Sequence, residues 1–358
     1  MNLSNSKAKL VIAGVVCGLV AAALAYFGNP GNMAICIACF IRDTAGALKL
    51  HQAAPVQYVR PEIIGMVLGA FIISIATKEY RSTAGSSPMI RFVLGIVIMI
   101  GSLIFLGCPL RMILRMSAGD LNAYVALIGF AGGVATGAVA LKKGFSLGRA
   151  YDTHKANGMV MPALMVGLLI LAVTTTLLVS STEGPGSMHA PIALALTGGV
   201  LFGIVAQKSR MCFAGGIRDV ALMKNFDLLA VIGGLFVVML IFNIAMGNFK
   251  FSFTGMPVAH SEHLWNILGM YTVGFAAVLA GGCPLRQLIL SGQGSSDAAV
   301  TVVGMFVGAA LAHNLGLASA GATPESAGGT TQAGRIACII AIAVCFVIAF
   351  TNKRQASK

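Results

Sequence analysis

Ten unbroken apolar runs are the feature that most limits how this chain can fold. An α-helix rises 1.5 Å per residue, so runs of this length can cross ~30 Å of hydrocarbon. A transmembrane β-barrel would instead show ~10-residue segments of alternating hydrophobicity. The sequence therefore predicts an all-α integral membrane protein, with a short or re-entrant element in the semi-polar segment 28–50. The expected spans are 10–27, 61–77, 92–107, 121–141, 159–180, 191–206, 228–246, 264–280, 298–317 and 336–350.

Composition excludes an ordinary soluble domain and argues against a nucleic-acid partner. Charged residues make up only 10% of the 358 residues, and the mean hydropathy is +0.89. A soluble chain of this size needs far more charge on its surface. The net charge of +13 comes from lysines and arginines scattered over short loops between the apolar runs. That distribution is typical of proteins that basic residues orient in a lipid bilayer.

The basic residues also predict the orientation of the chain. When the N-terminus is placed inside, seventeen of the 24 lysines and arginines fall in inside loops, Arg354 and Lys358 among them. This excess favours a bacterial inner (cytoplasmic) membrane protein with both termini in the cytoplasm. The basic residues left in outside loops are Arg42, Lys49, Arg60, Arg111, Arg115, Lys250 and Arg335.

Motifs recur in the same order in the two halves of the chain, which indicates an internal duplication. Each half holds five expected spans, and an odd number of spans reverses the second copy in the membrane. We therefore expect a first membrane repeat at 1–180 and an inverted second repeat at 181–358, which together form one transport domain. The matches are Gly107-Cys-Pro-Leu-Arg111 with Gly282-Cys-Pro-Leu-Arg286, Ile41-Arg-Asp43 with Ile217-Arg-Asp219, Gly129 and Gly133 with Gly304 and Gly308, and Gly14 and Gly18 with Gly199 and Gly203.

Inverted repeats are typical of secondary transporters and channels, whose substrate site lies near the midplane where interrupted helices meet. The inversion also explains the arginines in outside loops. Arg42 and Arg111 lie outside because their copies, Arg218 and Arg286, lie inside.

The Gly-Cys-Pro-Leu-Arg motif predicts an interrupted helix that presents a thiol. Gly107 and Gly282 allow close approach of the backbone, and Pro109 and Pro284 cannot continue a helical hydrogen-bond ladder. A broken backbone at membrane depth is tolerated only where it lines a cavity or is buried in protein. A thiol at such a break, followed three residues later by arginine, fits a soft-anion site. A buried structural cysteine beside a kink is the alternative, which two symmetric copies disfavour.

Cys36 and Cys212 form a second matching pair of cysteines. Cys36 and Cys39 also form a C-x-x-C, which taken alone suggests redox or metal chemistry. Cys39 corresponds to Gly215 in the second half, and we expect neither a metal site nor a cofactor. The cysteines of the repeated Gly-Cys-Pro motif are expected to line the narrowest part of a path near the midplane, with Cys36 and Cys212 farther out.

Two stretches carry a resemblance to a known family. Gln207-Lys-Ser-Arg-Met-Cys-Phe213, followed by Arg-Asp, and Ala280-Gly-Gly-Cys283 after a span resemble the YeeE/YedE family of sulfur-compound transporters. The resemblance covers nearly the whole chain, and Cys-Pro-Leu-Arg in both halves looks like the YedE branch, which is associated with selenium metabolism. The leucine before Gly107 and the Ile35-Cys-Ile37 stretch depart from the family pattern. The Pro-Leu-Arg tail leaves the sulfur or selenium species open.

The resemblance implies a function and a set of residues. In thiosulfate-transporting relatives, cysteines at these motif positions hydrogen-bond the ion and hand it along an hourglass-shaped path. By this resemblance Cys36, Cys108 and Cys283 correspond to the functional thiols, and Cys212 fills the matching position in the second half. The resemblance also implies a cytoplasmic partner, a small TusA-like sulfur-carrier protein.

The sequence thus favours a membrane transporter, not an enzyme, that takes up a small sulfur- or selenium-containing anion. Weakly donating S–H groups suit a polarisable sulfur or selenium atom. The alternative is a membrane thiol oxidoreductase, or an assembly subunit for a selenium-dependent enzyme, that uses Cys36 and Cys39 as a redox pair. A non-selective anion channel is a third possibility, and the oligomeric state stays open. The arginines expected to support the anion in the two vestibules are Arg42, Arg111, Arg218 and Arg286.

Overall fold

The computed structural model describes residues 3–323 and 326–353, so Arg354 and Lys358 of the loop count lie outside the described residues. Its regular structure is almost entirely helical, which confirms the all-α prediction; the short strands β1 (Thr83–Ala84) and β2 (Tyr151–Asp152) pair with each other. The helices are α1 (Leu3–Tyr26), α2 (Ile37–Ala47), η1 (Ala54–Val56), α3 (Pro61–Ala76), α4 (Pro88–Phe105), α5 (Pro109–Ser117), α6 (Leu121–Lys142), α7 (Lys155–Thr174), α8 (Ile192–Ser209), α9 (Phe213–Met223), α10 (Asp227–Ala245), α11 (His263–Leu279), α12 (Pro284–Gln293), α13 (Ser296–Asn314) and α14 (Gln332–Thr351).

The predicted spans are confirmed as long apolar helices. Within the described residues, ten helical segments are long and apolar enough to cross a membrane. Their ends differ from the apolar runs by a few residues; α7, for example, ends at Thr174, before the end of the 159–180 run. The semi-polar segment 28–50 contains α2, which is buried throughout its 11 residues. The protein is therefore a multi-pass membrane protein.

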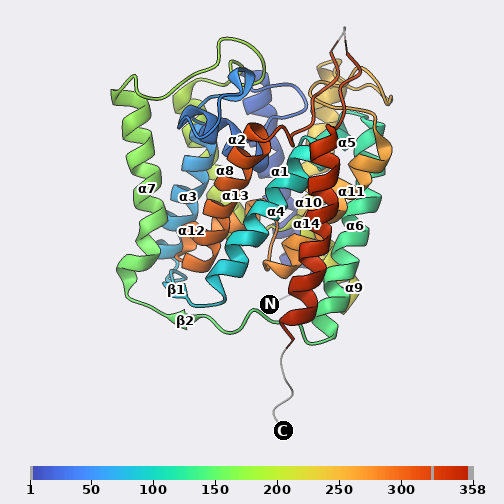
Figure 1. Cartoon of the computed structure of the whole chain (residues 1–358). Helices are drawn as coiled ribbons and strands as arrows, with labels where there is room; N and C mark the ends of the chain where they lie inside the picture. The colour runs from blue at the N-terminus through green and yellow to red at the C-terminus, as the bar shows by residue number, and fades with distance from the viewer. Residues whose placement is uncertain (1–2, 324–325, 354–358) are drawn as a thin grey trace.

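The long helices alternate in direction and divide the loops between an upper and a lower face (Figure 1). At the lower face, the loop after α6 meets the end of α14, where the Ser146 N–H donates to the Asn352 carbonyl. At the upper face, the loop after α5 meets the loop after α10, where the Leu121 N–H donates to the Ser252 carbonyl. The start of α1 and the end of α14 both lie toward the lower face (Figure 1).

The most extensive helix contacts join the two halves of the chain. They pair α1 with α10, α3 with α8, α4 with α13 and α6 with α11. The repeated glycines lie at these contacts: a Cβ at Gly133 of α6 would overlap the Tyr271 carbonyl of α11, and a Cβ at Gly304 of α13 would overlap the Phe92 carbonyl of α4. Small residues let helix backbones approach this closely in lipid. The glycine matches in the sequence are therefore packing positions.

The packing of the two halves is symmetric. When each helix is exchanged for its counterpart, the α6–α11 pair becomes the α13–α4 pair, and the α3–α8 pair becomes the α10–α1 pair. Counterparts also run in opposite directions, since α1 rises toward the upper face and α8 descends from it (Figure 1). An inverted duplication requires both features. The division into 1–180 and 181–358 stays a prediction, which this packing favours.

Helices α2, α5, α9 and α12 have only nine to eleven residues, too few to cross the hydrocarbon. We call them the short helices. Helices α2 and α5 lie between long helices that meet at the upper face, and α9 and α12 between long helices that meet at the lower face. They touch inside the bundle, where α2 packs against α12 and α5 against α9. The centre of the protein is thus built by elements that enter from both sides.

The alternation of the long helices predicts the topology. Reporters fused within 142–157 and at the C-terminus should read the same side, which the basic residues place in the cytoplasm, and a reporter within 181–189 should read the opposite side. Reporters within 142–157 and 181–189 that read the same side would exclude the arrangement of five spans on each side of 181.

The glycine contacts predict a sharp difference between two neighbouring positions on α6. Gly133→Ala would push a methyl group into the α11 backbone and should lower stability by about 1–3 kcal/mol. Gly132→Ala is the matched control, because its Cβ would lie 3.6 Å from the Tyr271 ring, an ordinary contact. Thermal unfolding in detergent measures both variants. Equal melting temperatures would mean that α6 and α11 are not in backbone contact.

Candidate functional site: thiol clusters at the helix breaks

Three thiols meet where α2 and α5 begin, and we call them the upper thiol cluster. Cys36 is the N-cap of α2, and its Sγ accepts a hydrogen bond from the Cys39 N–H at 3.3 Å. The Cys36 Sγ lies 2.8 Å from the Sγ of Cys39 and 3.9 Å from the Sγ of Cys108, the N-cap of α5. All three residues are buried. The cluster therefore joins the N-termini of two short helices.

Two thiols meet in the same way at the start of α9 and α12, and we call them the lower thiol cluster. Cys212 is the N-cap of α9, and its Sγ accepts from the Gly215 N–H at 3.2 Å. Its thiol neighbours that of Cys283, the N-cap of α12. Gly215 stands in the place that Cys39 fills in the upper cluster. The two clusters thus differ by one thiol.

Helix N-termini give both clusters a positive electrostatic environment. The first N–H groups of a helix lack partners within the helix and carry a partial positive charge. Each cluster lies at two such ends, where anions are stabilised. The thiols add weak, polarisable donors in a place shielded from water. This combination suits an anion with a soft atom such as sulfur or selenium.

The structure differs from the expectation that Cys36 and Cys212 lie farther out along a path. Cys36 lies beside Cys108, because the N-termini of α2 and α5 meet, and Cys212 lies beside Cys283 at the N-termini of α9 and α12. A separation of 3.9 Å between the Cys36 and Cys108 sulfur atoms leaves no room for two separate stages. The cysteines therefore form one group in each half. That Cys108 and Cys283 line the narrowest part of a path stays a prediction.

The upper break is stabilised by side chains that donate to its carbonyl groups. The last carbonyls of a helix have no partner within the helix. Arg115, His260 and Ser319 donate to carbonyls in the last turn of α4 at 2.8–3.0 Å. Leu106, in the left-handed conformation with φ 62°, ends α4 and presents its carbonyl to Arg111. The backbone can therefore stop at membrane depth without leaving unpaired carbonyls.

The lower break uses fewer side chains. Arg91 and Gln287 donate to the Ala280 carbonyl at 2.8 Å and 2.9 Å. Pro284 occupies the first turn of α12, as Pro109 does in α5, where a missing N–H costs nothing. The motif prolines thus start the short helices, in agreement with the predicted break.

The motif glycines make room for the motif arginines. A Cβ at Gly107 would lie 2.8 Å from the Cδ of Arg111, and a Cβ at Gly282 would lie 2.9 Å from the Cβ of Arg286. Each arginine side chain therefore folds back over the glycine four residues before it. The spacing of the Gly-Cys-Pro-Leu-Arg motif follows from this contact.

The two motif arginines nevertheless have different partners. Arg111 is fully buried, and its Nε donates to the Asn32 carbonyl at 3.0 Å. Its Nη1 contacts the Leu106 carbonyl and the Cys39 thiol, and its Nη2 contacts the carbonyls of residues 257 and 258. These contacts occupy all five donors of a guanidinium. Arg111 therefore anchors the upper loops to one another, which sequence alone did not indicate.

Arg286 keeps most of its donors. Among the described residues, its one side-chain hydrogen bond is from Nη1 to the Gln207 Oε1 at 3.2 Å. Gln207 lies in the Gln-Lys-Ser-Arg-Met-Cys-Phe stretch and was not a predicted site residue. The sequence feature that could have indicated Gln207 is its position five residues before Cys212. Arg286 can therefore present a planar pair of donors to an anion at the lower cluster.

The Arg-Asp motifs form ion pairs in both halves. The Arg42 Nη2 lies 2.7 Å from the Asp43 Oδ1, and the Arg218 Nη2 lies 2.8 Å from the Asp219 Oδ1. Asp43 also pairs with Arg60, whose Nη2 lies 2.7 Å from Oδ2. The upper network is buried, whereas Arg218 is 29% exposed. Arg42 and Arg218 are thus held in fixed positions by the aspartates that follow them.

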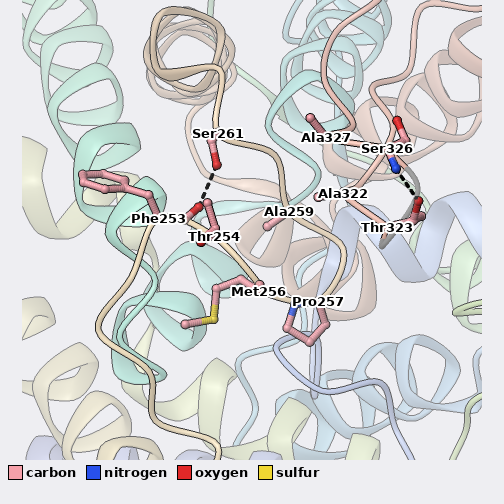
Figure 2. Close-up of a pocket in the computed structure, with 11 residues that line it drawn as sticks. Phe253, Thr254, Met256, Pro257, Ala259, Ser261, Ala322, Thr323, Ser326 and Ala327 are labelled. Atoms are coloured by element: carbon pink, nitrogen blue, oxygen red, sulfur yellow. Dashed lines mark hydrogen bonds between the residues drawn. The ribbon is translucent and has the colours of Figure 1, made fainter.

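Cavities lie among the upper loops next to this network. One has a volume of about 680 Å³. Figure 2 shows the residues that line it, among them Phe253, Met256, Pro257 and Thr323. No cysteine or arginine is among the described residues that line it, and we assign it no chemistry. Its wall at Pro257 belongs to the loop that Arg111 holds. A second cavity, of about 430 Å³, is lined by Arg42 and by Leu106 of the upper break.

Fold and site together define a helical membrane protein whose interrupted helices meet at thiols. Residues 208–356 match the family model described as sulphur transport. The chain is similar to the thiosulfate transporter TsuA of Spirochaeta thermophila, with 33% identity over 101 residues, 28% of this chain and 30% of the relative. It is also similar to the thiosulfate transporter TsuA of Escherichia coli K12, with 31% identity over 115 residues, 30% of each chain.

These matches support the resemblance to sulfur-compound transporters, and the family model covers the residues of the lower thiol cluster. The alignments span about 30% of the length of the curated relatives. They contain no indication of the YedE branch, which stays a prediction. Activity, substrate and partners are therefore matters for proposal.

The different partners of the two motif arginines predict different effects of Arg→Lys. Lysine offers a point charge and cannot reproduce planar, paired donors. Arg111→Lys should lower the melting temperature and the uptake of thiosulfate together, because the upper loops lose their anchor. Arg286→Lys should keep the melting temperature and raise the KM for uptake by about tenfold. Normal uptake by a well-expressed double Lys variant would show that both arginines are only structural.

Proposed function

We propose that the protein carries a small sulfur- or selenium-containing anion, such as thiosulfate or a similar species, across the bacterial inner membrane into the cytoplasm. The observation that carries this proposal is the pair of buried thiol clusters, one toward each face, each at two helix N-termini. Helix N-termini that stabilise anions and soft thiol donors together suit a sulfur-containing anion. The match of residues 208–356 to a family model described as sulphur transport supports the same class of substrate.

The path we propose runs from the upper to the lower face. Arg42 attracts the anion at the upper opening, and the upper thiol cluster binds its polarisable atom. Contacts of α2 with α12 and of α5 with α9 bring the two clusters' helices together, so the anion can pass to Cys212 and Cys283. Arg286 receives it at the lower side. Binding at each stage must be weak enough for onward release, as in conduction through successive sites.

The inverted halves and a cytoplasmic acceptor complete the proposal. Two related halves of opposite orientation, 1–180 and 181–358, would give each face the same entrance built from a short-helix pair. We propose that the released sulfur species is taken up by a small TusA-like sulfur-carrier protein, with both termini of the chain on the same, cytoplasmic side.

A thiol oxidoreductase is the second candidate, and the 2.8 Å contact between Cys36 and Cys39 favours it. In such a protein the pair would cycle between dithiol and disulfide. Alkylation of free thiols during turnover, followed by mass spectrometry, would detect the loss of two hydrogen atoms. In a transporter these cysteines stay reduced. Reconstituted vesicles given thiosulfate, sulfite, selenite or sulfate distinguish a selective transporter from a non-selective anion channel.

Alanine substitutions rank the thiols. Cys108→Ala or Cys283→Ala should cost only about 1 kcal/mol of stability, since little volume is lost. Thiosulfate uptake at matched membrane expression should fall by about tenfold or more, because a donor that bridges two helix ends is gone. Cys36→Ala and Cys212→Ala should lower uptake to a similar extent, because their thiols lie beside those of Cys108 and Cys283.

Cys345→Ala is the matched control for these variants. Cys345 is equally buried, but it lies inside the long helix α14, away from either cluster. Its loss should leave uptake nearly unchanged. Normal uptake by both Cys108→Ala and Cys283→Ala would mean that the thiols do not bind the substrate.

A further inference from the structure

The 430 Å³ cavity of the upper face lies directly above the upper break. Its walls come from α2, η1, the end of α4, the α7–α8 and α10–α11 loops, the end of α13 and the loop that follows α13. Leu106, the last residue before the Gly107-Cys108 pair, forms part of its floor. Arg42, His313 and Ser319 are among the polar residues that line it. The cavity therefore places charged and polar groups of the upper face beside the residue at which α4 ends.

Arg42 supplies positive charge to this cavity. Its Nε and Nη2 donate to Asp43 at 2.9 Å and 2.7 Å, and its Nη1 has no hydrogen-bond partner among the described residues. Asp43 is shared with Arg60, which also interacts with the buried carboxyl group of Glu62. The network thus leaves the Nη1 of Arg42 available to donate to an anion in the cavity.

His313 supplies a polar atom without a protein partner. Its ring stacks on that of His51, with centroids 4.5 Å apart and an interplanar angle of 28°. His51 is held in turn by a 3.0 Å hydrogen bond from its Nε2 to the Arg42 carbonyl. The Nε2 of His313 is buried and makes no hydrogen bond. A buried polar atom of this kind needs a partner, and a ligand in the cavity can provide one.

We infer that this cavity is an oxyanion-binding subsite, in which the Arg42 guanidinium and the Nε2–H of a neutral His313 hold the oxygen atoms of the substrate. The inference rests on the proposed function and assigns a binding role to His313. Arg111 has no free donor, and Arg42 is the arginine that lines this cavity. The oxygen end is bound here, and the soft end can then turn toward the upper thiol cluster.

Substitutions at His313 test the inference. His313→Phe keeps a flat ring against His51 and removes the donor, whereas His313→Gln keeps a neutral donor. Thiosulfate uptake into vesicles should show a KM raised about tenfold for the Phe variant, with an unchanged maximal rate, and a KM within about twofold of the wild type for the Gln variant. His189→Phe is the matched control, because His189 stacks on Tyr58 at the upper face but does not line this cavity.

Calorimetric binding of thiosulfate to the purified protein separates this inference from the proposed function. Weaker binding by His313→Phe than by the wild type and by His313→Gln supports the subsite, whether or not uptake is observed. Equal affinity of the wild type and His313→Phe overturns it. A lowered maximal rate with an unchanged KM in His313→Phe also overturns it, since His313 would then act only on the structure. Absence of saturable uptake by the wild type would instead overturn the proposed function.

Discussion

A backbone that stops inside the bilayer must still satisfy its polar groups, and this constraint shapes the centre of the protein. The carbonyls at the upper break receive donors from Arg115, His260 and Ser319, and the Ala280 carbonyl at the lower break receives them from Arg91 and Gln287. Charged and polar side chains are costly at such depth unless they are paired. Here the donating side chains permit the short helices to begin in the interior. The N-termini of these helices then bring three thiols together in the upper cluster and two in the lower cluster.

The same constraint separates residues that look equivalent in the sequence. Both halves carry Gly-Cys-Pro-Leu-Arg. Arg111 donates most of its hydrogen bonds to backbone carbonyls, whereas Arg286 donates one hydrogen bond to the Gln207 side chain. In the proposed function, the role of an anion-facing arginine therefore passes to Arg42 in the upper half. The recurring motifs supply the same chemical groups to both faces, and the loops packed around each motif decide which of its donors stay free.

The sequence was sufficient for features that depend on local patterns. Apolar runs predicted the long helices, and Pro109 and Pro284 predicted the breaks, because length and a missing N–H act within one segment. The partners of Arg111 could not be predicted, since the carbonyls at 257 and 258 are distant in the chain. The nearness of Cys36 to Cys108 was missed for the same reason: it arises from two short helices, not from either motif.

The difference of one thiol between the clusters bears on how transport would proceed. Cys39 adds a thiol donor to the upper cluster. Gly215, at the corresponding position of the lower cluster, has no side chain. An anion should then be held more strongly on the upper side. Unequal affinity of the two clusters cannot set the net direction of transport, which a concentration gradient must supply. It does affect the anion concentration at which each cluster becomes occupied. A stronger upper cluster favours capture from dilute solution, and a weaker lower cluster favours release where an acceptor keeps the free anion scarce. This difference suits uptake better than export, although both halves carry the same motifs.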